Sequence, residues 1–161
     1  MRGMEIQLIR ATVEDAEELL HIQKESFQTE YERYQDERSP FLMSLERMRL
    51  RINYPESAYY RIVHEDTTVG GIWVYEKEPG FFRLNILYVL PQYQSRGIGQ
   101  RAIAMVEALH DAVRWELDCP EDLPANRRCY ERAGYRLTGE REIINEKLTL
   151  VYYGKLRQPA E

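Results

Sequence analysis

The order of apolar and polar residues along the chain predicts a succession of helices and strands. Residues 5–11 form a short, largely apolar run, and the spacing of Thr12 and Asp15 resembles a capping box that starts a helix. The polar and aromatic stretch 25–40 predicts the end of that helix and a loop. In chain order, the predicted elements are a strand at 5–11, a helix with apolar residues from 16 to 27, a second helix between 44 and 55, strands at 58–66, 69–77 and 81–90, a helix over 97–113, a strand at 112–118, a helix over 124–134, and strands at 135–144 and 148–156.

This element order predicts a mixed α/β domain in which helices pack on both faces of a largely antiparallel sheet. The three strand-like runs between 58 and 90 are joined by short turns, as in an antiparallel meander. A turn at 145–147 joins the last two strands into a closing hairpin. With 161 residues, of which 43% are hydrophobic, the chain is expected to form one domain, 1–161, around one sizeable core.

Charge and cysteine content restrict the classes of function. A net charge of −5 argues against a general nucleic-acid binder, and no apolar run is long enough for a membrane-spanning helix or a signal peptide. Cys119 and Cys129 are too few for a disulfide framework, and no Cys/His spacing suggests a metal site. We therefore expect a cytoplasmic protein without a nucleic-acid, membrane or metal partner.

The most informative stretch is VLPQYQSRGIGQ at 89–100, where a predicted strand gives way to a helix. The start of a helix leaves main-chain N–H groups unpaired and is electropositive, and glycines let a ligand approach the backbone. Gly97 and Gly99, with Arg96 before them, therefore suit a phosphate-sized anion. A glycine turn that merely packs the helix on the sheet is an equally open interpretation of this motif alone.

A dinucleotide fingerprint is a second interpretation of the same stretch. Residues 97–102 fit G-x-G-x-x-A, and Asp118 lies at the distance that a ribose-binding carboxylate requires. Three features count against this interpretation: residues 91–96 separate the glycines from the strand, an antiparallel meander precedes them, and too little chain follows Asp118 for further parallel strands. A P-loop is excluded because no Lys-Ser or Lys-Thr follows the glycines.

Two motifs together resemble the GNAT superfamily of N-acetyltransferases. Residues 94–99, QSRGIG, match its Q/R-x-x-G-x-G/A signature, and residues 126–135 resemble its second signature, N-x-x-x-Y-x-x-x-G-[FY]. The resemblance is specific from about Leu84 to Tyr135, and the element order agrees with it over nearly the whole chain. It implies a central sheet of six or seven strands whose middle strands splay apart.

The resemblance also implies acetyl-CoA as the acyl donor and assigns residues to it. A bulged fourth strand would pair through its backbone with the pantetheine arm, and an N–H near Val89 would polarise the thioester carbonyl. Asn126 is similar to the residue that hydrogen-bonds this arm. The cofactor-binding positions that the resemblance implies are Leu87, Tyr88, Val89, Gln94, Ser95, Arg96, Gly97, Ile98, Gly99, Asn126 and Tyr130.

Tyr130 is the predicted catalytic residue, because a phenol within reach of the thioester sulfur can protonate the leaving thiolate. Without the motif, a tyrosine half-buried against the sheet would be the simpler interpretation. Its neighbour Cys129 offers an acyl-cysteine route, which we do not favour because adjacent helical residues point in different directions. Three arginines either meet the 3′-phosphate of CoA or pair with nearby glutamates, and the sequence leaves both roles open: Arg127, Arg128 and Arg132.

The sequence leaves the general base unassigned. Some members of the superfamily use a glutamate on the fourth strand, but Arg83 stands at the matching position, and Asn85 on the same face cannot take a proton. A carboxylate from elsewhere or an amine that arrives neutral would have to serve. This departure favours the alternative function, a non-catalytic acyl-CoA-binding module.

The leading hypothesis is transfer of an acetyl group from acetyl-CoA to a primary amine by direct attack in a ternary complex. The acceptor, a small molecule or a protein amine, is expected between the first two helices and the closing hairpin. A set of acidic and aromatic residues there suits a cationic amine, although a solvated acidic face is the plainer interpretation: Glu25, Glu30, Tyr31, Glu32, Tyr34, Asp36 and Glu37. The family resemblance also makes a homodimer possible.

Overall fold

The structure, a computed structural model, describes residues 4–157 and contains seven strands in this range. The strands are β1 (Gln7–Arg10), β2 (Ser57–His64), β3 (Thr67–Glu78), β4 (Phe81–Val89), β5 (Arg114–Pro120), β6 (Arg136–Asn145) and β7 (Leu148–Leu156). The helices are α1 (Ala16–Tyr34), α2 (Leu45–Ile52), α3 (Ile98–Leu109) and α4 (Pro124–Arg132), with short 3-10 turns at Val13–Asp15, Pro40–Leu42 and Pro91–Tyr93.

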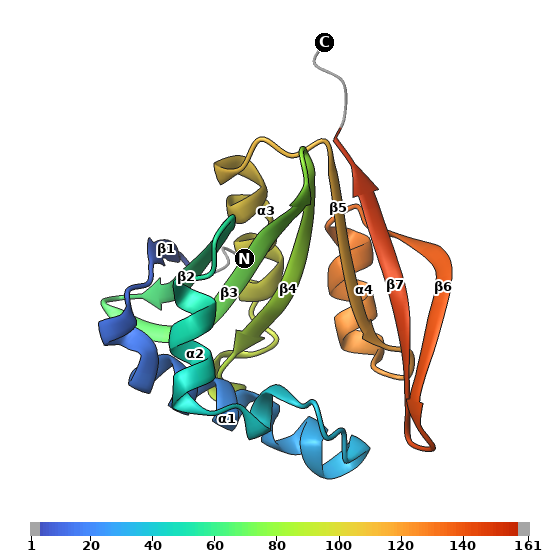
Figure 1. Ribbon diagram of the computed structural model, residues 1–161, viewed down its shortest axis with the longest axis horizontal. Helices are drawn as coiled ribbons and strands as arrows, with labels where there is room; N and C mark the ends of the chain where they lie inside the picture. Colours follow the sequence, from blue (N-terminus) through green and yellow to red (C-terminus); the bar gives the residue numbers. More distant parts are fainter. Residues whose placement is uncertain (1–3, 158–161) are drawn as a thin grey trace.

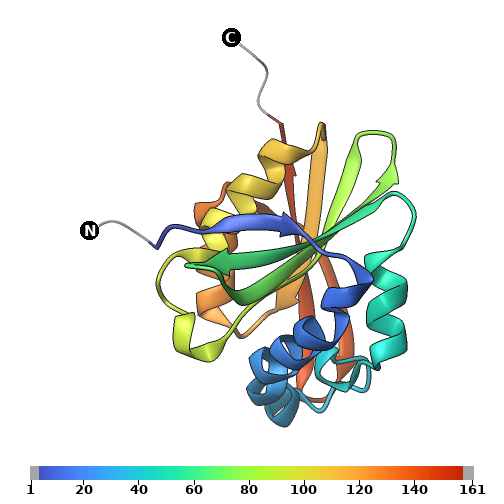
Figure 2. The ribbon, with the colours of Figure 1, turned by 90° about the vertical axis from the view of Figure 1, so that its left-hand side faces the viewer.

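One sheet runs through the molecule in the order β1-β2-β3-β4-β5-β7-β6, and β4–β5 is its parallel pair among antiparallel ones. Helices α3 and α4 lie on one face, and α1 and α2 lie on the other (Figures 1 and 2). The predicted mixed fold, with helices on both faces of a largely antiparallel sheet, is confirmed. Within residues 4–157, no helix combines the length and apolar character needed to cross a membrane.

Each face of the sheet has its own apolar core. The face under α3 buries Ile98, Ala102 and Val106 against β-strand residues and reaches Tyr130 of α4. The opposite face packs α1 and α2 against β2–β4 and includes Tyr88. Two cores on opposite faces hold the sheet between them, so that any opening within the sheet lies between two packed layers.

The middle of the sheet opens between β4 and β5. The two strands pair only where residues 81–83 meet 114–116. On β3, Val74 pairs with Leu84 and Trp73 with Ile86, so Asn85 is an extra residue and β4 carries a bulge there. Beyond the bulge the two strands diverge, with α1 crossing below them (Figure 1). The predicted splay of the middle strands is therefore present, and it begins where the pairing ends.

Helix α1 is longer than its pattern predicts. It continues through the polar stretch that was expected to be a loop and ends at Tyr34, after which Gln35 takes a left-handed conformation with φ of 51°. The glutamate, glutamine and arginine residues of this last part are good helix formers. The expectation of an earlier end was wrong because a polar, solvated helix face resembles a loop in composition.

Helix α3 is shorter than predicted and ends at Leu109 instead of reaching Val113. His110 is extended, and its imidazole Nε2 lies 3.0 Å from the Tyr60 hydroxyl, beside the rings of Phe82 and Trp115. This packing ends the helix, and the Val113 side chain, counted in the helical pattern, is 55% exposed. A tertiary contact thus overrides the local periodicity.

Candidate active site

The open edge of β4 presents main-chain groups that no neighbouring strand pairs. Alternate residues of a strand direct their N–H and C=O groups to opposite edges. Because the Leu90 N–H donates to the Val69 carbonyl of β3 at 2.8 Å, Leu87 and Val89 face the other edge, where β5 has diverged. The side-chain amide of Gln94 donates to the Val89 carbonyl across 2.9 Å. An extended ligand can therefore pair with this edge as an added strand.

Tyr88, predicted with its two neighbours, faces the other way. Its main chain faces β3, and its phenol is buried, with the oxygen 2.6 Å from the Tyr59 hydroxyl and 3.4 Å from the Leu19 carbonyl. The ring lies over Gly71, where an added Cβ would come within 2.5 Å of the Tyr88 hydroxyl. Tyr88 therefore holds β4 in place and reaches the site only as part of its wall.

The glycine loop forms the start of α3, as the sequence predicts. Ser95 and Gly97 have positive φ angles of 62° and 79°, and the helix begins at Ile98. These conformations turn the chain so that the first N–H groups of the helix are free for an anion. The Arg96 side chain is not part of the cleft lining; its guanidinium lies 3.8 Å from the Met4 sulfur and 5.9 Å from the centre of the Tyr93 ring.

A cleft of about 450 Å³ runs from this loop along the open edge of β4. It joins most of the predicted cofactor-binding residues on one surface. It also contains residues that the sequence did not single out, mainly from α1. Its lining includes Ser26, Phe27, Glu30, Leu87, Tyr88, Val89, Gln94, Ser95, Gly97, Ile98, Gly99, Asn126, Arg128, Cys129, Tyr130 and Arg132.

A second cavity, of about 180 Å³, adjoins the cleft. The two share Phe27, Glu30, Leu87, Asn126 and Tyr130. The second cavity extends toward the end of α1, the Ser39–Pro40 turn and strands β5 and β7. The sequence predicts the acceptor between the first two helices and the closing hairpin; this cavity lies between α1 and β7, and no residue of α2 lines it.

Tyr130 stands at the junction of the two cavities. Its ring is buried in the core, 6.3 Å from the Tyr153 ring, and 8% of the residue is exposed. Its hydroxyl makes no hydrogen bond within residues 4–157, whereas the other buried tyrosine hydroxyls of this range do, at positions 34, 59, 60, 88, 135 and 153. Burial, followed by the nearby Cys119 and Cys129, raises the pKa of Tyr130 well above its usual value. The phenol is therefore protonated at neutral pH and available as a donor.

The remaining candidates differ in where they point. Asn126 lines both cavities from the first turn of α4. Arg128 and Arg132 line the cleft, whereas Arg127 donates to the Tyr153 hydroxyl at 2.9 Å. Burial raises the pKa of the Cys129 thiol, so it is a poor nucleophile at neutral pH. Residues 4–157 contain no group of three His, Cys, Asp or Glu side chains arranged to hold a metal.

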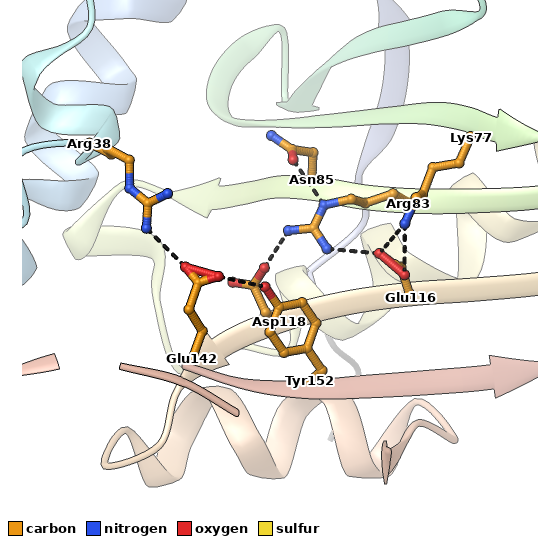
Figure 3. Close-up of polar contacts among 8 residues, drawn as sticks. All are labelled: Arg38, Lys77, Arg83, Asn85, Glu116, Asp118, Glu142 and Tyr152. Carbon is orange, nitrogen blue, oxygen red and sulfur yellow. Dashed lines mark hydrogen bonds and ion pairs between the residues drawn. The ribbon is translucent and has the colours of Figure 1, made fainter. Parts of the chain in front are cut away.

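The paired half of the β4–β5 seam is closed by a charge network (Figure 3). Arg83 forms ion pairs with Asp118 and, at 3.2 Å, with Glu116, and it donates to the Asn85 side-chain oxygen at 3.1 Å. Lys77 also contacts Glu116 at 3.0 Å. Arg83, which stands where the family resemblance led us to look for a glutamate, therefore ties β4 to β5 at the bulge and does not enter the cleft.

Polar contacts also join the closing hairpin to the end of α1. Asn145 donates from its side chain to the Tyr34 carbonyl at 3.0 Å, and Arg38 pairs with Glu142 at 3.1 Å (Figure 3). The Tyr34 hydroxyl donates to Asp122 at 2.6 Å. These contacts bridge the elements on either side of the second cavity and restrict its size.

Sequence reasoning named Glu30 and Tyr34 for the acceptor site, but it missed that they lie on a continuous helix, α1, which also lines the cleft. Gln23, Phe27, Glu30 and Tyr34 follow one another at helical spacing on one face of α1, and Phe27 and Glu30 line both cavities. The recurrence of Phe27 and Glu30 at helical spacing between the buried Gln23 and Tyr34 was the available signal, but using it requires the helix to continue past residue 27. Of the other acidic residues, Asp36 lines the second cavity, while Glu25 pairs with His21 at 2.8 Å.

In this protein, a bulged strand opens the sheet beside a glycine loop at the start of a helix. This arrangement places the fold in the class of acetyltransferases. The sequence model of the acetyltransferase (GNAT) family matches residues 16–135 of this chain. The chain belongs to this family, and the resemblance inferred from the two motifs is confirmed.

Known proteins share part of this sequence or its fold. An uncharacterized protein of Bacillus subtilis strain 168, YrkN, is 36% identical over 97 residues, which are 58% of this chain and 51% of that protein, so the match spans about half its length. An acetyltransferase from Thermus thermophilus has the same fold, with a TM-score of 0.75 and 19% identity over 98% of this chain and 100% of that one. The PaiA N-acetyltransferase of Thermoplasma acidophilum was solved with coenzyme A. It has a TM-score of 0.79 and 17% identity, over 96% of this chain and 100% of that one.

Proposed function

We propose that the protein transfers the acetyl group of acetyl-CoA to a primary amine by direct attack in a ternary complex. The observation that carries the proposal is the Tyr130 hydroxyl, which has no hydrogen-bond partner among residues 4–157 and lies at the junction of the two cavities. Membership of an acetyltransferase family supports the donor. A similar structure, that of PaiA, holds coenzyme A.

The cleft supplies the groups that acetyl-CoA requires. Its diphosphate would accept hydrogen bonds from the loop N–H groups of residues 94–99, at the electropositive start of α3. The pantetheine arm would pair with Leu87 and Val89, and the Asn126 side chain would hydrogen-bond it. Arg128 and Arg132, at the wall of the same cleft, would meet the 3′-phosphate.

The reaction then needs one carbon–nitrogen bond to form and one carbon–sulfur bond to break. The amine lone pair attacks the thioester carbon, and an N–H near Val89 stabilises the negative oxygen that develops. As the tetrahedral intermediate collapses, Tyr130 gives its proton to the leaving sulfur. The proton that the new amide nitrogen loses restores the phenol, and free CoA thiol leaves.

The second cavity is the proposed acceptor site. It opens on Tyr130, and its carboxylates suit a cation. Its volume of about 180 Å³ and the contacts that join Tyr34 and Arg38 to the hairpin favour a small amine over a protein chain. The free thiols of Cys119 and Cys129 support the proposed cytoplasmic location. A homodimer stays a prediction.

Replacing Tyr130 by phenylalanine tests this function. We expect kcat, measured as free-thiol release with a panel of small amines, to fall about a hundredfold, the scale of one lost general acid. The melting temperature should rise with acetyl-CoA as in the wild type. If the wild-type protein binds acetyl-CoA but releases thiol with no amine, it is a non-catalytic acyl-CoA-binding module.

A further inference from the structure

Glu30 lies at the junction between the proposed donor and acceptor sites. It is the carboxylate that lines both cavities, and the two other carboxylates of the second cavity, Asp36 and Asp118, line that cavity alone. Tyr130 lies at the same junction. A side chain in this place can contact the acceptor nitrogen on the side away from CoA.

The three carboxylates differ in their partners. Asp118 is paired with Arg83, and Asp36 accepts a hydrogen bond from the Arg38 N–H at 2.9 Å. Glu30 has neither an ion pair within 4.0 Å nor a hydrogen bond among residues 4–157. Because Glu30 is half-buried and has no partner in this range, its charge is partly removed from water without a compensating contact. The group is therefore free to take up a proton.

We propose that the Glu30 carboxylate takes the proton that an ammonium acceptor must lose before its nitrogen attacks the thioester, an inference that rests on the proposed acetyl transfer. The N–H bond of the ammonium breaks and an O–H bond forms at Glu30, which leaves the lone pair on nitrogen. The proton passes to water after the product leaves. Glu30 thus supplies the base that the fourth strand lacks, because Arg83 occupies that position and is bound in the charge network.

The surroundings of Glu30 support this role. Burial raises the pKa of Glu30 to about 7, and the nearby Arg33 opposes the rise. A base with a pKa near the working pH transfers protons most effectively. The other titratable or charged groups that line the two cavities around it are Tyr31, Tyr34, Asp36, Tyr88, Tyr93, Asp118, Cys119, Arg128, Cys129, Tyr130 and Arg132.

The test compares wild type, Glu30→Gln and the control Glu18→Gln, which removes the same charge from an exposed position of the same helix. With saturating acetyl-CoA and saturating ethylamine, ethanolamine or putrescine, kcat is measured from about pH 6 to about pH 9. In the wild type and the control, kcat should fall as pH falls through about 7, because Glu30 becomes protonated. In Glu30→Gln, kcat should be about a hundredfold lower and follow only the free-amine fraction.

Each outcome is decisive. Equal acetyl-CoA affinity of all three proteins, with loss of rate and of the inflection only in Glu30→Gln, supports the assignment. If Glu30→Gln keeps the kcat and the pH profile of the wild type, Glu30 is not the base. If Glu30→Gln no longer binds acetyl-CoA, the role of Glu30 is in binding and the assignment is likewise overturned. Both results leave the proposed acetyl transfer intact. A wild type that binds acetyl-CoA but acetylates none of the amines overturns the proposed function, and this inference with it.

Discussion

The two halves of the seam between β4 and β5 are built from the same strands but differ in how their polar groups are satisfied. In the closed half, Arg83 is bound to Glu116, Asp118 and Asn85, and the strands pair. In the open half, the pairing has ended, and Tyr130 and Glu30 have no hydrogen-bond partner within residues 4–157. The closed half holds the sheet together, whereas the open half lacks partners for its strands and polar side chains.

This contrast shows how the fold can hold polar side chains for which it provides no hydrogen-bond partner. A buried polar group without a partner costs about 1–3 kcal/mol, so such groups persist only where something else offsets that cost. The network at Arg83 secures the strands at one end, which lets them diverge at the other. We interpret the open half as the place where acetyl-CoA and the acceptor complete the missing contacts.

The largest effect is expected from opening the closed half. Arg83→Leu leaves the half-buried Asp118 without its ion pair, and we expect unfolding free energy to fall by about 3 kcal/mol. The exposed pair of Arg38 and Glu142 provides the control, because Arg38→Gln should cost no more than about 0.5 kcal/mol. Denaturant unfolding of both variants measures the difference; equal costs would contradict the distinction between the halves.

The closed half also shows what the sequence could predict. The element order and the helix-start loop follow from local patterns, namely apolar alternation, Pro91 and the two glycines, whereas the bulged fourth strand was implied only by the family resemblance. The sequence showed that Arg83 stands in place of the expected glutamate. It did not show that Arg83 pairs with Asp118, 35 positions away, because a strand pattern does not reveal which side chains meet across neighbouring strands.

The open half was predicted in part. The two motifs identify Gly97, Asn126 and Tyr130, and the structure brings all three to one cleft. They do not identify Glu30, because it lies on α1, outside both motifs, in a stretch that resembled a loop. The absence of Arg96 from the cleft lining was not predictable either, because its guanidinium contacts Met4, 92 positions away in the chain.

A second prediction concerns the charge of Glu30 in the folded state. Its pKa is raised to about 7 in the folded protein from an ordinary value near 4.5, so between these pH values the folded state binds more protons than the unfolded state. Stability should therefore fall as pH rises through this window, by about 2 kcal/mol. Glu30→Gln should remove that decline, and Glu18→Gln should keep it. Unfolding curves at about pH 5 and pH 8 check this, and a decline unchanged in Glu30→Gln would refute it.

Two tyrosines on either side of Gly134 sharpen the comparison further. Tyr135 donates to Glu107 at 2.8 Å, so Tyr135→Phe should cost about 1 kcal/mol of stability without a change in kcat. The Tyr130 hydroxyl has no such partner among residues 4–157, so Tyr130→Phe should raise stability or leave it unchanged while lowering kcat. Parallel unfolding and turnover assays distinguish the two variants. If Tyr135→Phe lowered kcat and Tyr130→Phe did not, the assignment of catalysis to Tyr130 would be wrong.

The smallest effect is expected at Cys129, which lines the cleft beside Tyr130. Burial raises the pKa of its thiol, and direct transfer needs no acyl-cysteine. Cys129→Ala should therefore keep kcat within about threefold of wild type, a change of less than about 1 kcal/mol. Loss of turnover, together with acetyl-protein in the mass spectrum of the wild type, would indicate a two-step route instead.

The most direct test of the account is a crystal structure with acetyl-CoA bound. We expect the diphosphate at the start of α3, the pantetheine arm paired with Leu87 and Val89, and the thioester sulfur within hydrogen-bond distance of the Tyr130 hydroxyl. A coenzyme bound elsewhere, or a sulfur out of reach of that hydroxyl, would contradict the claim that the open half of the seam is the active site.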